Sequence, residues 1–208
     1  MKEKIISVIN QKGGVGKTTT VINLAAGLSQ NNKKILVIDL DPQGNATTGL
    51  GLLNNSQSSN SIYEVLSGSK KIDDVISKTK FSNLDIITSN VDLSGLEVET
   101  ADDGRRAYIL KEKLASYLND SRGHYDYVLI DCPPSLSLLT VMALVASHSL
   151  LVPLQTEFFA LEGITQLIKT IDRIKVGLNP NLEIRGILLT MFDKRNKLSS
   201  EVELEARN

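Results

Sequence analysis

Short apolar runs alternate along the chain with segments in which apolar positions recur every three or four residues. The run "KKILVIDLD" has consecutive apolar positions, which is typical of a strand buried on both faces. The segment "GKTTTVINLAAGLSQNN" has apolar residues at 21, 24, 25 and 28, which form one face of a helix. We predict strands at residues 4–10, 33–41, 83–89, 125–134, 148–155 and 182–192, and helices at 16–32, 61–66, 71–78, 103–120, 136–147 and 161–178.

This alternation of strands and helices predicts an α/β fold, in which a mainly parallel sheet carries helices on both faces and so forms three layers. Residues 43–61 are rich in glycine, serine and asparagine, and they predict a long flexible connection. In sheets of this kind, ligands bind at the carboxyl ends of the strands. Functional residues are therefore expected directly after the strands.

The composition fits a single domain over residues 1–208. Hydrophobic residues make up 41% of the chain, which is enough for a sizeable core. The net charge of −1 is evenly spread, so no basic region independently indicates nucleic-acid binding. The single cysteine, Cys132, excludes an intramolecular disulfide and fits a reducing compartment. Neither a signal peptide nor an apolar run long enough to span a membrane is visible, so we expect a cytoplasmic protein with no membrane partner.

The stretch "NQKGGVGKTTT" lies between the first predicted strand and the first predicted helix. Residues 12–18 read Lys-Gly-Gly-Val-Gly-Lys-Thr, a variant of Gly-x-x-x-x-Gly-Lys-[Ser/Thr] in which Gln11 replaces the first glycine. Glycines let the backbone approach a ligand, and successive N–H groups can then form a concave anion site. Lys17 can reach the β- and γ-phosphates of a nucleotide, and the Thr18 hydroxyl can ligate Mg²⁺. The stretch therefore predicts a phosphate-binding loop.

Aspartates end two of the apolar strands. "ILVIDLDPQGN" contains Asp39 and Asp41, and "YVLIDCPPS" contains Asp131. A carboxylate at a strand end beside a phosphate loop can hold Mg²⁺ directly or through water, or can orient the attacking water. One such aspartate alone would be explained better as a helix cap or a turn residue, but two strands that end in this way favour a functional role. We expect Cys132, beside Asp131, to be a small buried packing residue.

The segments "KGGVGKT", "VIDLDPQGNAT" and "YVLIDCPPSLSLLT" together resemble the ParA/Soj group of partition ATPases, in the deviant Walker A family that also includes MinD. The resemblance continues through "VPLQTEFFALEGITQL" and "GILLTMFDKRNKLSSEV", so it covers nearly the whole chain. It implies a P-loop NTPase fold and slow ATP hydrolysis stimulated by a ParB-like partner. It also implies a homodimer that forms with ATP, binds DNA non-specifically, is associated with the nucleoid, and acts in chromosome or plasmid partitioning.

The resemblance implies roles for individual residues. Lys12 reaches across a nucleotide-sandwich dimer to the second subunit's ATP, although the residue alone could equally be an exposed lysine near an anion site. Asp41 positions the attacking water. The implied catalytic residues are Lys12, Lys17 and Asp41, the implied ATP-binding residues are Lys12, Gly13, Gly14, Val15, Gly16, Lys17, Thr18 and Thr19, and the implied Mg²⁺ residues are Thr18, Asp39 and Asp131.

The chain departs from the family near its end. Family members usually continue beyond the "LLTMFDKRNKLSSEV" region, so we expect the domain to lack the usual C-terminal segment. The charged ending "EVELEARN" shows no apolar face long enough to replace a missing helix. Lys194, Arg195 and Lys197 could contact DNA or nucleotide, or could belong to a solvated loop. The alternatives are a MinD-like division-site regulator with a basic amphipathic C-terminal helix, a metabolic ligase on the same scaffold, and a truncated remnant without function.

Overall fold

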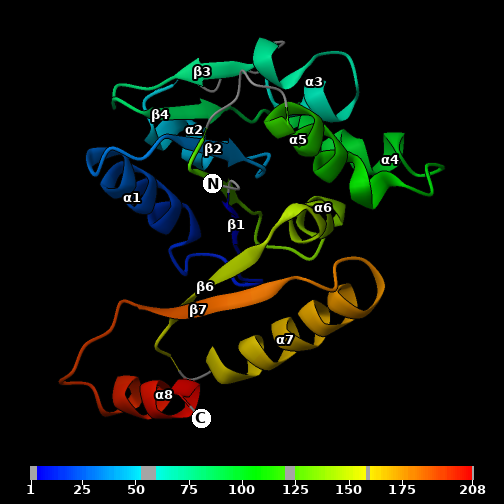
Figure 1. Cartoon of the computed structure of the whole chain (residues 1–208). Helices are drawn as coiled ribbons and strands as arrows, with labels where there is room; N and C mark the ends of the chain where they lie inside the picture. The colour runs from blue at the N-terminus through cyan, green and yellow to red at the C-terminus, as the bar shows by residue number, and fades with distance from the viewer. Residues whose placement is uncertain (1–3, 53–59, 120–124, 158–159, 208) are drawn as a thin grey trace.

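A twisted sheet forms the centre of the molecule. The computed structural model describes residues 4–52, 60–119, 125–157 and 160–207, and within them the sheet has seven strands (Figure 1). The strand order is β3-β4-β2-β5-β1-β6-β7, and only the β3–β4 pair is antiparallel. The strands are β1 (Lys4–Val8), β2 (Ile35–Asp39), β3 (Ile76–Lys78), β4 (Leu84–Ile87), β5 (Tyr127–Asp131), β6 (Ser149–Gln155) and β7 (Glu183–Thr190).

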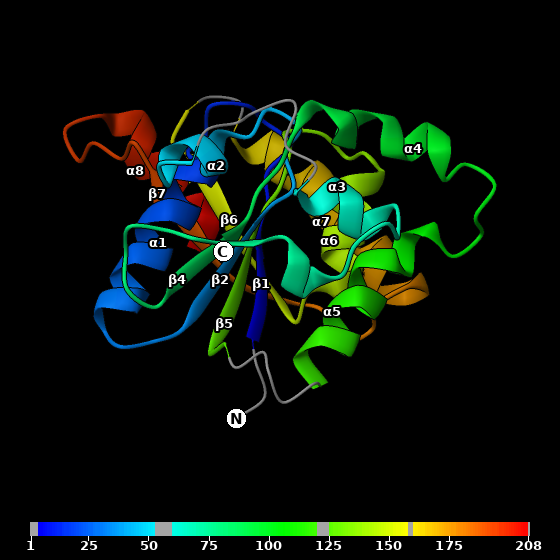
Figure 2. The same ribbon diagram turned by 90° about the horizontal axis from the view of Figure 1, so that it is seen from above.

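Helices cover both faces of the sheet, which confirms the predicted three-layer α/β fold (Figure 2). α1 (Lys17–Gln30) and the short α2 (Asn45–Gly49) lie on one face. The opposite face carries α3 (Ile62–Leu66), α5 (Ile109–Asn119), α6 (Leu138–Ala146), α7 (Ala160–Gly177) and α8 (Lys197–Arg207). The remaining elements are α4 (Leu96–Glu99) and the 3₁₀ turns η1 (Ile72–Asp74), η2 (Val91–Gly95) and η3 (Arg106–Tyr108). None of the helices in the described ranges is long and apolar enough to cross a membrane.

The central strand β2 shows why the sheet needs helices on both faces. All five of its residues are fully buried, as expected for a strand between two layers. Ile35 and Val37 pack in the cluster under α1, while Leu36 and Ile38 pack in the cluster under α5 and α6. Side chains alternate between the faces along a strand, so one continuous apolar run contributes to two separate cores.

The helix predicted at residues 71–78 is wrong. The segment contains η1 and then the edge strand β3, because Ile76 to Lys78 pair with β4. Lys78 lies opposite Asp85 across this strand pair, and its Nζ donates to the Asp85 carboxylate at 2.7 Å. A short segment with mixed apolar spacing does not distinguish a helix from an edge strand, and the pairing with β4 decides the outcome here.

The predicted flexible connection at 43–61 contains a helix. α2 begins at Asn45, directly after Gly44, whose φ of 64° lies in the left-handed region. The helix is fixed by a buried side chain, Thr47, which bonds back to the end of β2. Tertiary contacts therefore override the weak helix propensity of this stretch. Residues 53–59 of the predicted connection lie outside the described residues.

The charged C-terminal segment forms a helix, α8. In α8, Leu198, Val202 and Ala206 recur every four residues and pack toward Leu154 of β6. Val202 is only 2% exposed. A narrow apolar stripe is enough here, because β7 and α7 already provide the opposing surface.

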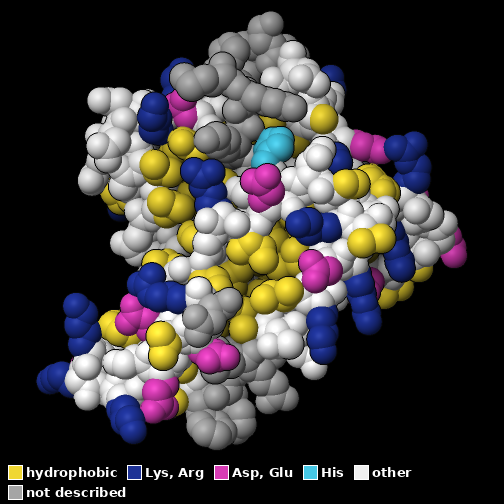
Figure 3. Space-filling view, turned by 60° about the horizontal axis from the view of Figure 1, so that its bottom comes forward, with side chains coloured by type: hydrophobic (Ala, Val, Ile, Leu, Met, Phe, Trp, Pro, Cys, Tyr) yellow, Lys and Arg dark blue, Asp and Glu magenta, His cyan; other side chains and the backbone are white. Residues whose placement is uncertain are grey.

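The edge strand β7 is less well covered on the face toward α1. Ile187 and Leu189 pack toward α7 and α8, so Leu188 between them points to the opposite face, where it is exposed. Ile184 and Met191 are exposed as well. Figure 3 shows hydrophobic side chains gathered in a hollow near the middle of one face of the molecule. Among the described residues, no strand pairs with the outer side of β7.

Candidate functional site

Three strands bring the predicted site residues to one edge of the sheet. Val8 of β1 pairs in register with Asp131 of β5, and Asp131 pairs with Asp39 of β2. The phosphate loop leaves the sheet directly after β1, between the ends of these strands and the start of α1. The order β2-β5-β1 therefore places the loop and both aspartate-ending strands side by side, as expected for a ligand site in a parallel sheet.

The loop has the backbone shape that its glycines allow. Gly14 and Gly16 have φ angles of 77° and 89°, in the left-handed region that side chains disfavour. Gly16 is the N-cap of α1, and no side chain caps the helix there. The first N–H groups of α1 are thus left for another acceptor, and groups of this kind can bind an anion.

Two side chains that the sequence did not single out hold the loop in place. Asn10 donates from Nδ2 to the carbonyl oxygen of Pro153 at 2.7 Å and accepts from the N–H of Lys12 at 3.0 Å. Thr190, at the end of β7, donates to the carbonyl oxygen of Val15 at 2.9 Å. The loop is therefore tied to both β6 and β7. Asn10, a polar residue that ends an apolar strand, offered a local signal, whereas Thr190 offered none.

Lys17 is buried at the start of α1 and points back along the loop. Its Nζ donates to the carbonyl oxygen of Lys12 at 2.9 Å, and the residue is 7% exposed. Burial lowers the pKa of Lys17, while the nearby negative charge of Asp131 opposes that change. The ammonium thus lies inside the curl of the loop, where a bound phosphate would compensate it better than a carbonyl does.

Asp39 is a fully buried carboxylate whose oxygens are already bonded. Its Oδ2 accepts from the N–H of Thr47 at 2.8 Å and from the Thr47 hydroxyl at 2.7 Å, and its Oδ1 accepts from the N–H of Asp41 at 3.2 Å. Burial raises the pKa of Asp39 to about 6, although these hydrogen bonds oppose the rise. In this conformation Asp39 joins the end of β2 to α2.

Asp131 has the opposite surroundings. Both of its carboxylate oxygens are buried, and none of the described residues donates a hydrogen bond of ordinary geometry to either one. Burial raises the pKa of Asp131 to about 7, the neighbouring Asp39 adds to the rise, and the hydroxyl of Thr18 and the charge of Lys17 oppose it. A buried carboxylate without a partner beside a phosphate loop fits a cation or a cation-bound water.

The described carboxylates do not form a metal cage by themselves. No group of three or more histidine, cysteine, aspartate or glutamate side chains that could hold a metal ion exists within the described ranges. Mg²⁺ usually takes one or two protein ligands and completes its shell with water and nucleotide phosphates. Thr18, at the start of α1, and Asp131 are the groups placed to contribute.

Asp41 lies just beyond the end of β2 and is 7% exposed. Its Oδ1 accepts from the N–H of Gln43 at 3.0 Å, and its carbonyl accepts from the N–H of Gly44 at 2.9 Å. These bonds fix the turn that leads into α2, and they hold the side chain beside Lys17 and Asp131, whose pKa values it affects. Asp41 is therefore grouped with the predicted site, as expected.

Lys12 stands apart from this buried group. Its side chain is 48% exposed, and it forms an ion pair with Glu157, which follows β6. Gly13, Gly14 and Thr19 are also exposed, and a Cβ built on Gly13 or Gly14 would meet nothing within 4 Å. The outer lip of the loop thus faces open space, while Lys17 and the aspartates line its inner side.

Cys132 follows Asp131 but has the character of a packing residue. It is 1% exposed, and burial raises the pKa of its thiol. A buried thiol that stays protonated is a poor nucleophile. The expectation of a packing role for Cys132 fits these surroundings.

Comparison with known proteins gives matches along nearly the whole chain. A family model described as an AAA domain matches residues 3–184. The chromosome partitioning protein ParA of Caulobacter vibrioides is 49% identical over 98% of this chain and 75% of its own length, and the sporulation initiation inhibitor protein Soj of Bacillus subtilis is 44% identical over 98% of this chain and 79% of its own. A crystal structure of cobyrinic acid a,c-diamide synthase from Mycobacterium smegmatis with a bound ATP analogue and magnesium is 38% identical, with a TM-score of 0.91 over 99% of this chain and 79% of that one.

Proposed function

Because the chain belongs to the ParA/Soj family of partitioning ATPases, we propose that it binds Mg-ATP at the phosphate loop and hydrolyses it slowly during chromosome or plasmid partitioning. One observation carries this proposal: the uncapped start of α1 and the buried Lys17 lie beside the buried carboxylate of Asp131, which accepts no hydrogen bond of ordinary geometry from the described residues. The first two suit a phosphate and the third suits a cation, so together they match a magnesium nucleotide.

We assign the nucleotide contacts to the loop and its first helical turn. When a nucleotide binds, the Lys17 ammonium leaves the carbonyl oxygen of Lys12 and contacts the β- and γ-phosphates. Thr18 and Asp131 serve the magnesium, which supplies positive charge against the phosphates when it is bound. Asp39 acts indirectly, because its oxygens hold Thr47 and the backbone of Asp41. The backbone contacts of the phosphates come from residues 12–19.

Asp41 is the group we assign to the attacking water. Its backbone is held by Asp39 and by the turn toward α2, so the carboxylate is fixed in place without being fully bonded. A carboxylate in that state can accept a hydrogen bond from water and align it with the γ-phosphate. Lys17 balances the negative charge of this group.

Lys12 supports a dimer that forms around the nucleotides. It lies on the outer lip of the loop, half-exposed, while Lys17 occupies the inner side. A cation on the outer lip can face the triphosphate of a second subunit and offset the repulsion between two nucleotides, as an arginine finger does in other enzymes. The ATP-dependent homodimer is the form that we expect to bind DNA non-specifically and to meet a ParB-like partner in the nucleoid.

Two other functions receive less support. The structural relative is named for a synthase, but it is 38% identical, whereas the partitioning protein ParA is 49% identical. A membrane-binding regulator would need a basic amphipathic helix. Among the described helices, α8 is not of that kind, because it has three glutamates, one lysine and one arginine, and it packs its apolar stripe inside the fold.

The test is ATP turnover by the purified chain alone, with DNA, and with DNA plus a ParB-like protein. We expect slow turnover that rises when both are added, whereas a synthase would depend on a small-molecule substrate and not on DNA. Lys17→Ala should abolish nucleotide binding, while Lys111→Ala on the exposed side of α5 should not. Unchanged affinity of Lys17→Ala for a fluorescent ATP analogue would contradict the assignment of the loop.

A further inference from the structure

A glutamate outside the phosphate loop is paired with the loop's outer lysine. Glu157 follows β6, and its carboxylate forms an ion pair with the ammonium of Lys12. The atom involved, Oε1, is buried, and no described residue donates a conventional hydrogen bond to it. Lys12 is thus the partner on which this oxygen depends, whereas the lysine itself remains half-exposed.

Both members of the pair are held in place by the same strand end. The N–H of Lys12 donates to Asn10, whose side-chain amide donates to the carbonyl of Pro153 in β6. The N–H of Glu157 donates to the carbonyl of Gln155 at 2.9 Å. The backbones of the loop lysine and of the glutamate are therefore both attached to this end of β6.

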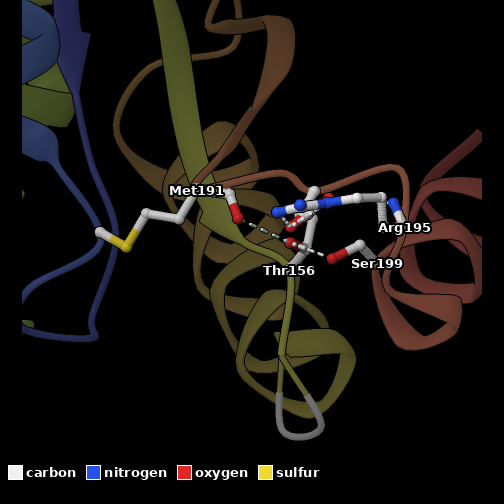
Figure 4. A network of polar contacts seen from close by, with 5 residues as sticks. Thr156, Met191, Arg195 and Ser199 are labelled. Atoms are coloured by element: carbon white, nitrogen blue, oxygen red, sulfur yellow. Dashed lines mark hydrogen bonds and ion pairs between the residues drawn. The ribbon is translucent and has the colours of Figure 1, made fainter.

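The residue beside Glu157 connects the strand end to β7 and α8. Thr156 is buried, and its hydroxyl lies 3.5 Å from the carbonyl oxygen of Met191 and 3.0 Å from the hydroxyl of Ser199 (Figure 4). Figure 4 shows the Thr156 side chain pointing between Met191 and Ser199, which come from the segment after β7 and from α8. The residue before Glu157 is consequently anchored on two parts of the fold, the segment after β7 and α8.

We propose that Glu157 is a positioning residue that holds the Lys12 ammonium on its own subunit until the phosphates of a nucleotide in a second subunit replace the glutamate. This inference rests on the proposed sandwich dimer. A triphosphate carries more negative charge than one carboxylate, so the exchange of partners is favourable when the second subunit brings ATP. Without that nucleotide, Lys12 stays paired with Glu157 of its own subunit.

The pair therefore sets a threshold for dimerisation. Before Lys12 can reach across, its bond to Glu157 must break, and the buried oxygen of Glu157 must find water or another donor. Removing the carboxylate charge lowers this threshold. Glu157→Gln should dimerise at a concentration about twofold to fivefold lower than the parent chain, which is the range expected for a partly exposed ion pair.

The ion pair itself can be tested without nucleotide. Acetylation of lysine amines, followed by mass spectrometry, measures the reactivity of each lysine in the monomer. We expect Lys12 to react several times faster in Glu157→Gln, because its amine is no longer held against the glutamate and is more open to the reagent. Glu157→Asp should restore part of the protection. Glu112→Gln, which removes an exposed ion pair with Arg105 on α5, should leave Lys12 unchanged.

Dimerisation is then measured by light scattering with a non-hydrolysable ATP analogue over a concentration series. Faster labelling of Lys12 together with a lower half-dimerisation concentration for Glu157→Gln supports the proposal. Unchanged labelling overturns it, and so does faster labelling without easier dimerisation. A parent chain that stays monomeric with the ATP analogue overturns the proposed sandwich dimer, and the exchange of partners falls with it. This result differs from the two above, in which the parent dimerises and only the role of Glu157 is rejected.

Discussion

Two aspartates lie side by side at the ends of β2 and β5, yet their carboxylates are in opposite states of hydrogen bonding. Asp39 accepts three hydrogen bonds from Thr47 and Asp41, while neither oxygen of Asp131 accepts one of ordinary geometry from the described residues, although the Thr18 hydroxyl lies nearby. Asp39 is thus a structural link to α2, and Asp131 is the carboxylate that still needs a positive partner. At the scale of single residues, the site is organised by this difference.

Asp131 should make the nucleotide-free protein less stable as pH rises. Its pKa of about 7 in the folded chain lies above the ordinary value of 3.8, so the folded state favours the protonated form. That stabilisation is complete below pH 3.8 and is lost as pH rises through about 7. Between pH 5 and pH 8 the parent should lose on the order of 2 kcal/mol relative to Asp131→Asn, whose side chain does not ionise.

Urea denaturation of both proteins at several pH values measures this difference. Asp39 is present in both proteins, and its effect on the pKa of Asp131 is part of the difference that is measured. If the free energy of unfolding changes with pH in the same way for the parent and for Asp131→Asn, Asp131 does not ionise in this pH range.

Asp41→Ala should bind ATP normally but hydrolyse it at least about 100-fold more slowly, because the carboxylate that orients water is lost. Phosphate release measures hydrolysis, and a fluorescent nucleotide measures binding. Asp73→Ala, at an exposed aspartate in η1, is the matched control and should keep both properties. Turnover by Asp41→Ala at the parent rate would remove Asp41 from the mechanism.

At the scale of elements, α8 shows how little apolar surface a helix needs once its neighbours are in place. Its stripe of Leu198, Val202 and Ala206 packs against a surface formed by β6, β7 and α7. The same helix provides Ser199 to the Thr156 network at the end of β6. α8 therefore contributes both to packing and to the geometry beside the phosphate loop.

Val202→Ala should destabilise the protein by about 1–2 kcal/mol, because it removes buried methyl groups and leaves a small cavity. Leu204→Ala on the same helix is the matched control. Leu204 is 65% exposed, so its loss should cost less than about 0.5 kcal/mol. The midpoints of urea denaturation measure both changes, and equal losses for the two variants would mean that α8 does not pack through Val202.

Local patterns explain which elements the sequence predicted. The phosphate loop depends on the spacing of Gly14 and Gly16, and the central strands depend on continuous apolar runs, so both are visible in short segments. β3 and α2 are decided by pairing with β4 and by the bond between Thr47 and Asp39, which no local pattern contains. The loop contacts to β6 and β7 join residues far apart in the chain, so the sequence could not predict them either.

At the scale of the whole molecule, two lysines lie on opposite sides of the phosphate loop, Lys17 on the inner side and Lys12 on the outer side. Lys17 is buried among its own subunit's carboxylates, whereas Lys12 is half-exposed and paired with Glu157. In the proposed dimer, each nucleotide would meet one lysine from each subunit. A symmetric dimer contains two such sites, so a single substitution affects both.

Lys12→Ala should bind ATP as a monomer but fail to form the ATP-dependent dimer. Removing one side of a buried ion pair leaves charge uncompensated and costs on the order of 3–5 kcal/mol, which would weaken the dimer at least about 100-fold. Light scattering with a non-hydrolysable ATP analogue measures the dimer, with Lys111→Ala as the control. If Lys12→Ala dimerises as well as a dimerising parent, Lys12 is an ordinary surface cation.

The strand order has a consequence for synthesis on the ribosome. β1 is made first, yet it lies between β5 and β6, which begin at Tyr127 and Ser149. The apolar residues Ile5, Ile6 and Val8 must therefore wait for most of the chain to emerge before both neighbours of β1 exist. Contacts between such distant segments close late and leave early apolar strands open to chaperones in the meantime. The nascent chain cannot complete the centre of its sheet until residue 155 has left the exit tunnel.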